Sequence, residues 1–177
     1  MMTTLHGAAF FDRDGVINED HGYVHQASDF VLLPGAADAI RACNRAGLFV
    51  FVVTNQSGVA RGYYDVAAVD ALHRHMLQIL AVQDAGIDDI RYCPHLPQGS
   101  VAAFAVDCEC RKPAPGMIRD LLKAWPVDPA RSFLVGDKPS DVAAAQAAGV
   151  AGHLLHDRDI HGLVRRILVA QGAGQPA

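Results

Sequence analysis

The chain has 177 residues, of which 51% are hydrophobic and 19% charged, and its formal net charge is -4. This length suits one domain with a full apolar core, and the composition excludes an intrinsically disordered chain. The small negative charge gives no electrostatic basis for nucleic-acid binding, so an anionic ligand would need a local site. The first residues lack the basic and apolar regions of a signal peptide, and no apolar run reaches the roughly 18 residues of a membrane span. We therefore expect one domain over residues 1–177, located in the cytoplasm, with no nucleic-acid or membrane partner.

Apolar runs alternate with amphipathic segments from the first strand to the end of the chain. The expected strands cover residues 8–11, 48–54, 89–93, 132–137 and 151–155, and the expected helices cover 36–47, 65–84, 115–125, 140–149 and 161–171. The second strand is apolar on both faces, which is typical of a parallel strand covered on both sides. The alternation predicts an α/β fold, a Rossmann-like parallel sheet flanked by helices.

Polar and charged groups follow several of these strands. "DRDG" (12–15) follows the first strand, "TNQSG" (54–58) ends the second, and "GDKPSD" (136–141) ends the fourth, while "RKP" (111–113) follows a cysteine-rich stretch. Parallel sheets place their ligand sites beyond the carboxyl ends of the strands. We therefore expect these four segments to meet at one edge of the sheet.

The residue types at this edge suit phosphoryl transfer. Asp12 and Asp14 point the same way in an extended chain, and two carboxylates so close together favour a bound cation. With Asp137 they offer the oxygen ligands that Mg²⁺ prefers. One Asp can attack phosphorus and a second can move protons, while Thr54 and Lys112 stabilise the transferring group. A lone Asp-x-Asp pair is also common in solvated turns, so the prediction depends on all five residues together.

Three of the four cysteines lie in one segment with a histidine. Cys93-x-His95 is followed, after twelve residues, by Cys108-x-Cys110. In a reducing compartment a disulfide is disfavoured, and three sulfurs with one imidazole suit a closed structural Zn²⁺ site. Metal binding would clip a long loop without periodic structure. The alternatives are chance buried cysteines or a redox pair, and Cys43 is expected to be an inert core thiol.

The four polar segments resemble the motifs of haloacid dehalogenase-superfamily phosphatases. They read "FFDRDGVIN", "VVTNQSG", "RKPAPGM" and "VGDKPSD" here. The resemblance implies that Asp12 is the nucleophile, Asp14 the acid/base, and Thr54 and Lys112 the phosphoryl stabilisers. It also implies that Mg²⁺ is held by the Asp12 carboxylate, the Asp14 backbone carbonyl and Asp137.

The cysteine cluster narrows this resemblance. Cys-x-His and Cys-x-Cys followed by Arg-Lys-Pro resemble the D-glycero-D-manno-heptose 1,7-bisphosphate phosphatases and the related histidinol-phosphate phosphatases. The long gap, "DHGYV" (20–24) and "NQSGVARGYY" (55–64) are similar to the heptose group. The resemblance implies that no separate cap domain exists and that loops 18–30, 57–64 and the zinc loop 93–110 replace it. It implies substrate contacts from Asp20, His21, Gly22, Tyr23, Asn55, Gln56, Ser57, Arg111 and Lys138.

The expected activity is Mg²⁺-dependent removal of the 7-phosphate from the heptose bisphosphate through an aspartyl-phosphate intermediate, leaving heptose 1-phosphate. By resemblance, this reaction serves the synthesis of lipopolysaccharide heptose precursors. The alternatives are a histidinol-phosphate phosphatase and a non-catalytic, zinc-stabilised binding module. We expect a monomer whose partner is a small sugar bisphosphate. The sequence leaves open the preferred anomer, and whether Arg61 and His25 contact substrate or solvent.

Overall fold

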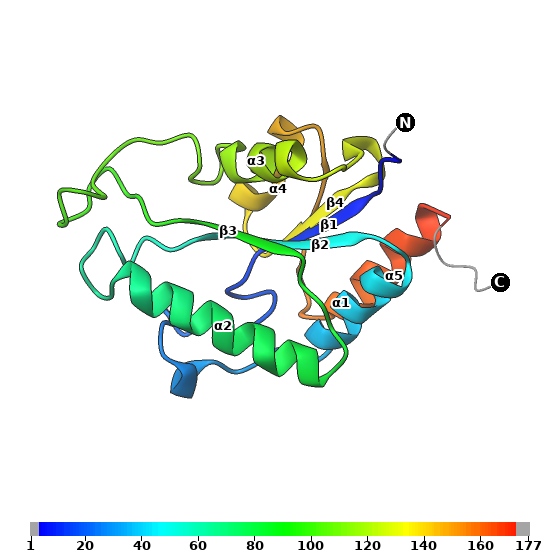
Figure 1. Ribbon diagram of the computed structural model, residues 1–177, viewed down its shortest axis with the longest axis horizontal. Helices are drawn as coiled ribbons and strands as arrows, with labels where there is room; N and C mark the ends of the chain where they lie inside the picture. The colour runs from blue at the N-terminus through cyan, green and yellow to red at the C-terminus, as the bar shows by residue number, and fades with distance from the viewer. Residues whose placement is uncertain (1–3, 173–177) are drawn as a thin grey trace.

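The computed structural model describes residues 4–172 and contains one sheet of five parallel strands (Figure 1). The strands are β1 (Ala8–Phe11), β2 (Phe49–Asn55), β3 (Asp89–Cys93), β4 (Phe133–Gly136) and β5 (Ala151–Leu154). Their order across the sheet is β3-β2-β1-β4-β5, so β1 lies at the centre. This confirms the predicted parallel α/β sheet. Within the described range, no helix is long and apolar enough to cross a lipid bilayer.

Helices cover both faces of the sheet (Figure 1). On one face lie α1 (Ala36–Arg45), α2 (Val66–Val82) and α5 (Ile160–Ala170), and on the other α3 (Gly116–Ala124) and α4 (Pro139–Ala147). The side chains of β1 alternate between the two cores: Ala9 and Phe11 join one, whereas Ala8 and Phe10 join the other. Fully burying a phenylalanine stabilises a fold by about 1.5–3 kcal/mol, so β1 contributes to both sides of the sheet.

The predicted elements match the observed ones to within a few residues at each end. Asp65 is a residue type that favours a helix N-cap and begins the predicted helix 65–84. It caps α2, because its carboxylate accepts a hydrogen bond from Ala68 N at 2.8 Å.

The helical spacing of the apolar residues in the predicted helix 65–84 places Val69, Leu72, Met76, Leu77 and Leu80 on one buried face. This prediction is wrong for Leu77, which is 36% exposed. His73 is buried on this face of α2, where it forms a hydrogen bond with the buried side chain of Arg13. Cys43 is fully buried, as expected of a core thiol, and burial raises its pKa to about 12.

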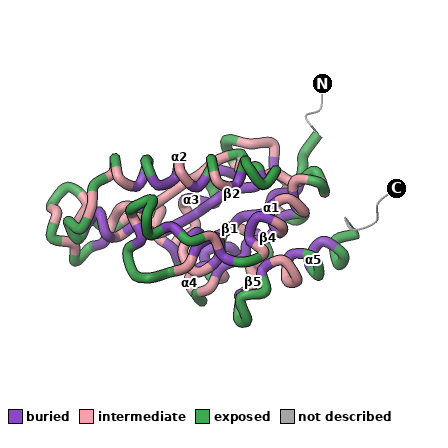
Figure 2. The backbone as a smooth tube through the Cα atoms, turned by 90° about the horizontal axis from the view of Figure 1, so that it is seen from below, coloured by how far each residue is buried: buried purple, intermediate pink, exposed green. Residues whose placement is uncertain are grey.

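The order of the strands changes direction at the boundary between β1 and β4, which are neighbours in the sheet but not in the chain. After β1 it moves outward to β2 and β3, and it then returns to β4 and β5 on the other side of β1. Phe11 is in register with Val52 and Val135, so the segments that follow these three strands emerge side by side. Figure 2 shows buried strands at the centre, with exposed residues in the connecting loops and on the outer sides of the helices. Ligands of open α/β sheets bind at such a reversal point.

Candidate active site

A cavity of about 640 Å³ opens at the carboxyl edge of the sheet, within the size range typical of small-molecule sites. Twelve residues predicted from the sequence line it: Asp12, Asp14, Asp20, Gly22, Tyr23, Thr54, Asn55, Gln56, Ser57, Arg111, Lys112 and Lys138. Four lining residues were not predicted: Tyr64, Pro113, Ser140 and Asp141. The structure therefore brings together residues from four separate segments of the chain.

Asp12 and Lys112 form the buried floor of this cavity. Asp12 Oδ1 accepts a hydrogen bond from Arg13 N at 2.8 Å and lies 3.0 Å from Lys112 Nζ. Lys112 Nζ also lies 2.6 Å from Asp141 Oδ1 and donates to Val53 O at 2.8 Å. Burial by itself lowers the pKa of Lys112, but the Asp12 and Asp141 carboxylates outweigh it and leave that pKa above its ordinary value. A permanent positive charge is thus held beside Asp12.

Three carboxylates form a candidate cation site beside this floor. Asp12, Asp137 and Asp141 each place an oxygen within 4.8 Å of the others. Asp137 Oδ1 is buried and, within residues 4–172, has no hydrogen-bond partner. Burial and the nearby charges of Asp12 and Asp141 raise the pKa of Asp137 to about 6, although Lys138 acts in the opposite direction. An unpartnered buried oxygen among carboxylates fits a hard cation such as Mg²⁺.

Asp14 is turned away from this acidic group and toward Arg13. Arg13 is fully buried, and its Nη2 lies 2.9 Å from both carboxylate oxygens of Asp14. Asn18 Nδ2 donates to Asp14 Oδ1 at 3.0 Å, and Gln56 Nε2 donates to Asp14 Oδ2 at 2.9 Å. The side chain of Asp14 is therefore held by three residues, and it is not part of the Asp12, Asp137 and Asp141 group.

A buried histidine completes the surroundings of Arg13. Arg13 Nη1 lies 3.2 Å from His73 Nε2, on α2. Burial, and then the charge of Arg13, lower the pKa of His73 to about 3. His73 is accordingly neutral, and its Nε2 accepts the hydrogen bond from the guanidinium.

Sequence reasoning missed Arg13, His73, Tyr64 and Asp141. Arg13 lies between the two predicted aspartates, and such a cation between acids was a usable signal. Asp141 ends the segment "GDKPSD", and its Oδ2 accepts from Lys138 N at 3.0 Å, which closes the first turn of α4. The spacing of His73 from Val69 and Met76 indicates the buried face of α2, but its partner Arg13 is distant in the chain and is brought to it only by the fold.

The first predicted substrate loop reaches the cavity with some residues and not with others. Asp20 lies 3.5 Å from Lys138 Nζ at the cavity mouth, and Gly22 and Tyr23 line the wall. His21 is 54% exposed, pairs with Glu19 at 3.2 Å, and lines a separate hollow nearby. His21 therefore does not line the main cavity, although it shares the neighbouring hollow with Gly22 and Tyr23.

Aromatic contacts join the first loop to the second. Tyr23 meets Tyr63 edge-to-face with ring centroids 4.9 Å apart, and the Arg61 guanidinium lies 5.8 Å from the Tyr23 ring. His25 stacks on Tyr64 at 4.7 Å. Arg61 and His25, which the sequence left open, thus pack against the loops themselves.

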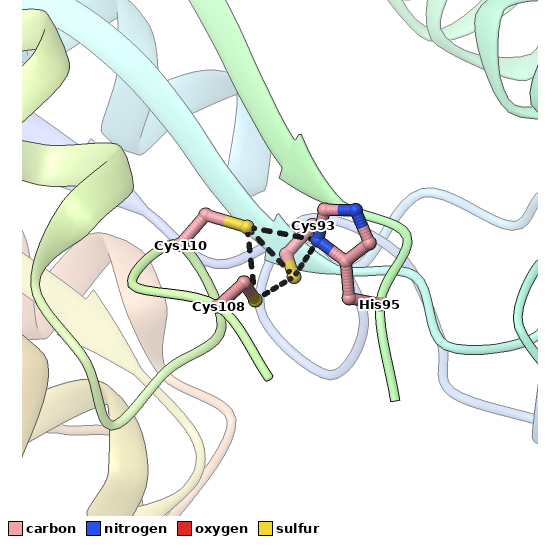
Figure 3. A group of neighbouring side chains, drawn as sticks. All are labelled: Cys93, His95, Cys108 and Cys110. Carbon is pink, nitrogen blue, oxygen red and sulfur yellow. Dashed lines mark hydrogen bonds between the residues drawn. The ribbon is translucent and has the colours of Figure 1, made fainter. Parts of the chain in front are cut away.

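The cysteine cluster assembles as predicted. The side chains of Cys93, His95, Cys108 and Cys110 point toward one another (Figure 3). The sulfurs are 3.0–3.5 Å apart, and His95 Nδ1 lies 3.3 Å from Cys110 Sγ. These separations exceed the roughly 2.05 Å of a disulfide bond. Four donors around a Zn²⁺ at about 2.3 Å would be slightly under 4 Å apart, so the cluster can hold this ion.

The cluster also holds the third loop against the cavity. Arg111 Nη1 donates to His95 O at 3.3 Å, so a cysteine-cluster residue orients a cavity-lining arginine. Farther along, Val101 N donates to Ala60 O at 2.9 Å and Ser100 Oγ donates to Arg61 O at 2.8 Å. The third loop is thereby bonded to the second.

The sequence is similar to known proteins over most of its length. The family model described as HAD-hydrolase-like matches residues 109–157. A D-glycero-beta-D-manno-heptose-1,7-bisphosphate 7-phosphatase from Rhodopseudomonas palustris is 53% identical over 162 residues, covering 92% of this chain and 90% of that protein. The enzyme of the same name from Escherichia coli is 47% identical over 148 residues, covering 84% of this chain and 78% of the Escherichia coli protein.

The chain belongs to this family of HAD-like heptose-bisphosphate phosphatases. A crystal structure of the D,D-heptose 1,7-bisphosphate phosphatase from B. bronchiseptica, complexed with magnesium and phosphate, agrees with this assignment. It superposes with a TM-score of 0.80 and 34% identity, covering 93% of this chain and 99% of that one. This chain thus shares its fold and most of its length with the heptose-bisphosphate phosphatase family.

Proposed function

We propose that this enzyme removes the 7-phosphate of D-glycero-β-D-manno-heptose 1,7-bisphosphate and releases heptose 1-phosphate and inorganic phosphate. The observation that carries the proposal is the arrangement of Asp12, Asp14, Thr54 and Lys112 around one cavity. The bond to be broken and the β anomer follow from the names of the related enzymes.

Asp12 is the proposed nucleophile. Its Oδ1 accepts the bonds from Arg13 N and Lys112, and within residues 4–172 its Oδ2 accepts none. One carboxylate oxygen attacks phosphorus and forms an aspartyl phosphate while the bond from phosphorus to the sugar oxygen breaks. Lys112 and the Thr54 hydroxyl stabilise the charge that builds on the phosphoryl oxygens. Because the three N–H groups of Lys112 already meet Asp12, Asp141 and Val53 O, its contribution here is mainly its charge.

Asp14 is the proposed acid and base. In the first step it gives a proton to the leaving sugar oxygen, and in the second it takes a proton from water. That water attacks phosphorus and breaks its bond to Asp12, which returns the carboxylate and releases phosphate. Because Asp14 lines the cavity and is fixed by Arg13, it can serve both steps from one position.

The cation of the site is proposed to be Mg²⁺, held by Asp12, the Asp14 backbone carbonyl and Asp137. Bound there, it would neutralise charge on the phosphoryl oxygens. The unpartnered Asp137 Oδ1 and the raised pKa of this carboxyl support this assignment. Asp141 lies close enough to assist, but Lys112 and Lys138 N already occupy its two oxygens.

Substrate contacts are proposed for Asp20, His21, Gly22, Tyr23, Asn55, Ser57, Arg111 and Lys138. All except His21 line the cavity, so His21 would need its loop to rearrange before it touched the sugar. Asn55 exchanges bonds of 3.1 Å with the Lys112 backbone, which leaves one N–H of its amide for a ligand. Arg111 is proposed to bind the phosphate that does not react, since a guanidinium grips phosphate with two parallel bonds.

The cysteine cluster is proposed to bind a structural Zn²⁺. Four protein donors fill the coordination sphere and leave no open position for substrate. The ion would fix the zinc loop and, through the carbonyl of His95, the side chain of Arg111. All four donors come from one chain, and the protein is proposed to act as a monomer.

The proposed reaction is tested by following both phosphates with ³¹P NMR. We expect the 7-phosphate signal to be replaced by inorganic phosphate while the anomeric phosphate stays, only when Mg²⁺ is present. Loss of the anomeric phosphate would contradict the proposal. Faster hydrolysis of histidinol phosphate would favour that related activity, and no turnover of either substrate would favour a zinc-stabilised binding module.

A further inference from the structure

Gln56 lines the cavity, and its position in "TNQSG" predicts substrate contact, yet it is almost fully buried. A glutamine amide can donate two hydrogen bonds and accept two. Its Nε2 donates to Asp14 Oδ2 and to Thr54 Oγ1, both at 2.9 Å. Its Oε1 accepts from Tyr64 OH at 3.0 Å and from Arg13 Nη2 at 3.3 Å. Protein groups therefore occupy all four positions, and none is left for a substrate.

The orientation of this amide is set by its neighbours. An arginine only donates and an ionised carboxylate only accepts, so a turned amide would oppose Arg13 and Asp14 alike. The Tyr64 hydroxyl, 3.0 Å from Oε1, can donate or accept and is compatible with this orientation. Arg13 and Asp14 thus specify which end of the Gln56 amide faces Asp14.

This orientation decides the direction of the Thr54 hydroxyl. Thr54 Oγ1 accepts the hydrogen bond from Gln56, so its own proton is free to point elsewhere. Across residues 4–172 the hydroxyl donates to no protein acceptor. Phosphoryl oxygens only accept hydrogen bonds, and Thr54 lines the cavity where they would lie. A glutamine that donates to Thr54 therefore makes Thr54 a donor to the phosphoryl group.

The same amide restrains Asp14. Gln56 donates to Oδ2 and Asn18 donates to Oδ1, while Arg13 reaches both oxygens. A small rotation of Asp14 would break at least one of these bonds. The Gln56 amide thus connects the acid/base to the phosphoryl stabiliser through a single rigid group.

We propose that Gln56 is a positioning residue for phosphoryl transfer: it directs the Thr54 proton toward the substrate, holds Asp14 in place, and does not itself bind the sugar. The inference rests on the proposed roles of Asp14 and Thr54. It extends to Tyr64, which holds the amide from the second loop and so links that loop to the reacting groups.

Two substitutions at this position separate positioning from substrate contact. Gln56→Met keeps the length of the side chain and removes all four hydrogen bonds, whereas Gln56→Glu keeps its shape and removes both N–H donors. For Gln56→Met we expect kcat to fall about 10- to 150-fold, the effect of losing hydrogen bonds to charged groups, with KM changed less than about twofold. Gln56→Glu should lose more, because its carboxylate repels Asp14 and accepts the Thr54 proton.

Three further variants complete the experiment. Gln78→Glu adds the same charge on the exposed face of α2 and should retain wild-type kcat. Ser57→Ala, next in the chain and also in the cavity wall, should act mainly on KM. Tyr64→Phe removes one hydrogen bond to Oε1 and should lower kcat by less than Gln56→Met does. Should Gln56→Met fail to fold, Gln56→Glu and Tyr64→Phe decide the question by the same division between kcat and KM.

A loss confined to kcat supports the positioning role. A rise in KM with kcat kept within about twofold of wild type would show substrate contact and overturn it, as would wild-type values for both constants. Wild-type turnover of the heptose bisphosphate tests the proposed function separately. If that turnover is absent, the same variants assayed with p-nitrophenyl phosphate still test the role of Gln56.

Discussion

The two ends of the cavity are held together in different ways. At the sheet edge, Thr54 and Lys112 are 1% and 4% exposed, and every reacting side chain is bonded to other protein groups. At the loop end, Tyr23 is 42% exposed, and Lys138 Nζ lies 3.5 Å from Asp20 and 3.8 Å from Asp137. The sheet thus fixes the groups proposed for chemistry, whereas loop contacts and a cysteine cluster fix those proposed for recognition. Substitutions at the sheet edge should therefore mainly impair the chemical step, whereas substitutions at the loop end should mainly impair substrate recognition.

The largest effect is expected at the sheet edge, from Asp12→Asn. The substitution keeps the shape of the side chain but removes the nucleophile, so turnover should fall on the order of 10⁴-fold or more. No acid-stable phosphoenzyme should form after rapid quenching. Asp84→Asn, an exposed change of the same chemistry at the end of α2, is the control. Near-normal turnover of Asp12→Asn would remove Asp12 from the chemistry.

Asp14→Asn is expected to cost less than the loss of the nucleophile. It removes a proton carrier, and general acid–base catalysis contributes roughly 10²–10⁴-fold. Because Arg13 would keep a partner in the Asn oxygen, phosphate binding should survive better than turnover. Steady-state kinetics and inhibition by inorganic phosphate measure the two quantities. A loss of less than about tenfold would contradict the assigned role.

At the loop end, the test is removal of the metal. Purified protein should contain about one zinc per chain, and Cys108→Ser combined with Cys110→Ser should contain none. Misplacing the zinc loop should lower kcat/KM for the bisphosphate about 10- to 100-fold and affect p-nitrophenyl phosphate less. Cys43→Ala removes a thiol from a different place, the core beneath α1, and should keep the zinc. Wild-type protein without zinc would refute a structural metal site.

The smallest effect concerns stability, and it comes from His73. Its folded pKa of about 3 lies below the unfolded value near 6.5, so the unfolded chain binds a proton first as the pH falls. The stabilising contribution is complete above about pH 6.5 and is lost between there and pH 3, with about 2 kcal/mol gone at pH 5.

Urea unfolding at pH 7.5 and pH 5 measures this loss. In His73→Gln the free energy of unfolding should decrease less between these pH values than in wild type. His75→Gln, two positions along the same helix, is the matched control and should behave like wild type. An identical decrease in His73→Gln and wild type would show that His73 is not held neutral.

Much of this difference between the two ends was predictable from the sequence. Strands that are apolar on both faces are recognised from the sequence alone, and parallel topology places their carboxyl ends together. The sequence pattern therefore predicts that Asp12, Thr54 and Asp137 lie together at one edge of the sheet. The cysteine cluster was equally predictable, because few roles suit three thiols and an imidazole in one loop.

The partners of the reacting groups were not predictable in the same way. Arg13 and His73 are 60 residues apart, and only the packing of α2 against the first loop brings them together. Helical spacing places position 73 on the buried face, four residues after Val69 and three before Met76, but it does not reveal that Arg13 is the partner of the buried histidine. The position of Gln56 in its motif likewise predicts contact with the substrate, whereas its hydrogen bonds in the structure are all to protein groups.

The central claim is that adjacent residues serve the two ends separately, Arg111 in recognition and Lys112 in chemistry. It is tested most directly by kcat/KM of Arg111→Ala and Lys112→Ala on the heptose bisphosphate and on p-nitrophenyl phosphate. Arg111→Ala should lose about 1.5–3 kcal/mol of transition-state stabilisation on the bisphosphate and much less on p-nitrophenyl phosphate, which has no second phosphate. Lys112→Ala should damage both substrates alike, because both pass through the same phosphoryl transition state. Equal losses on the two substrates for Arg111→Ala would contradict the division.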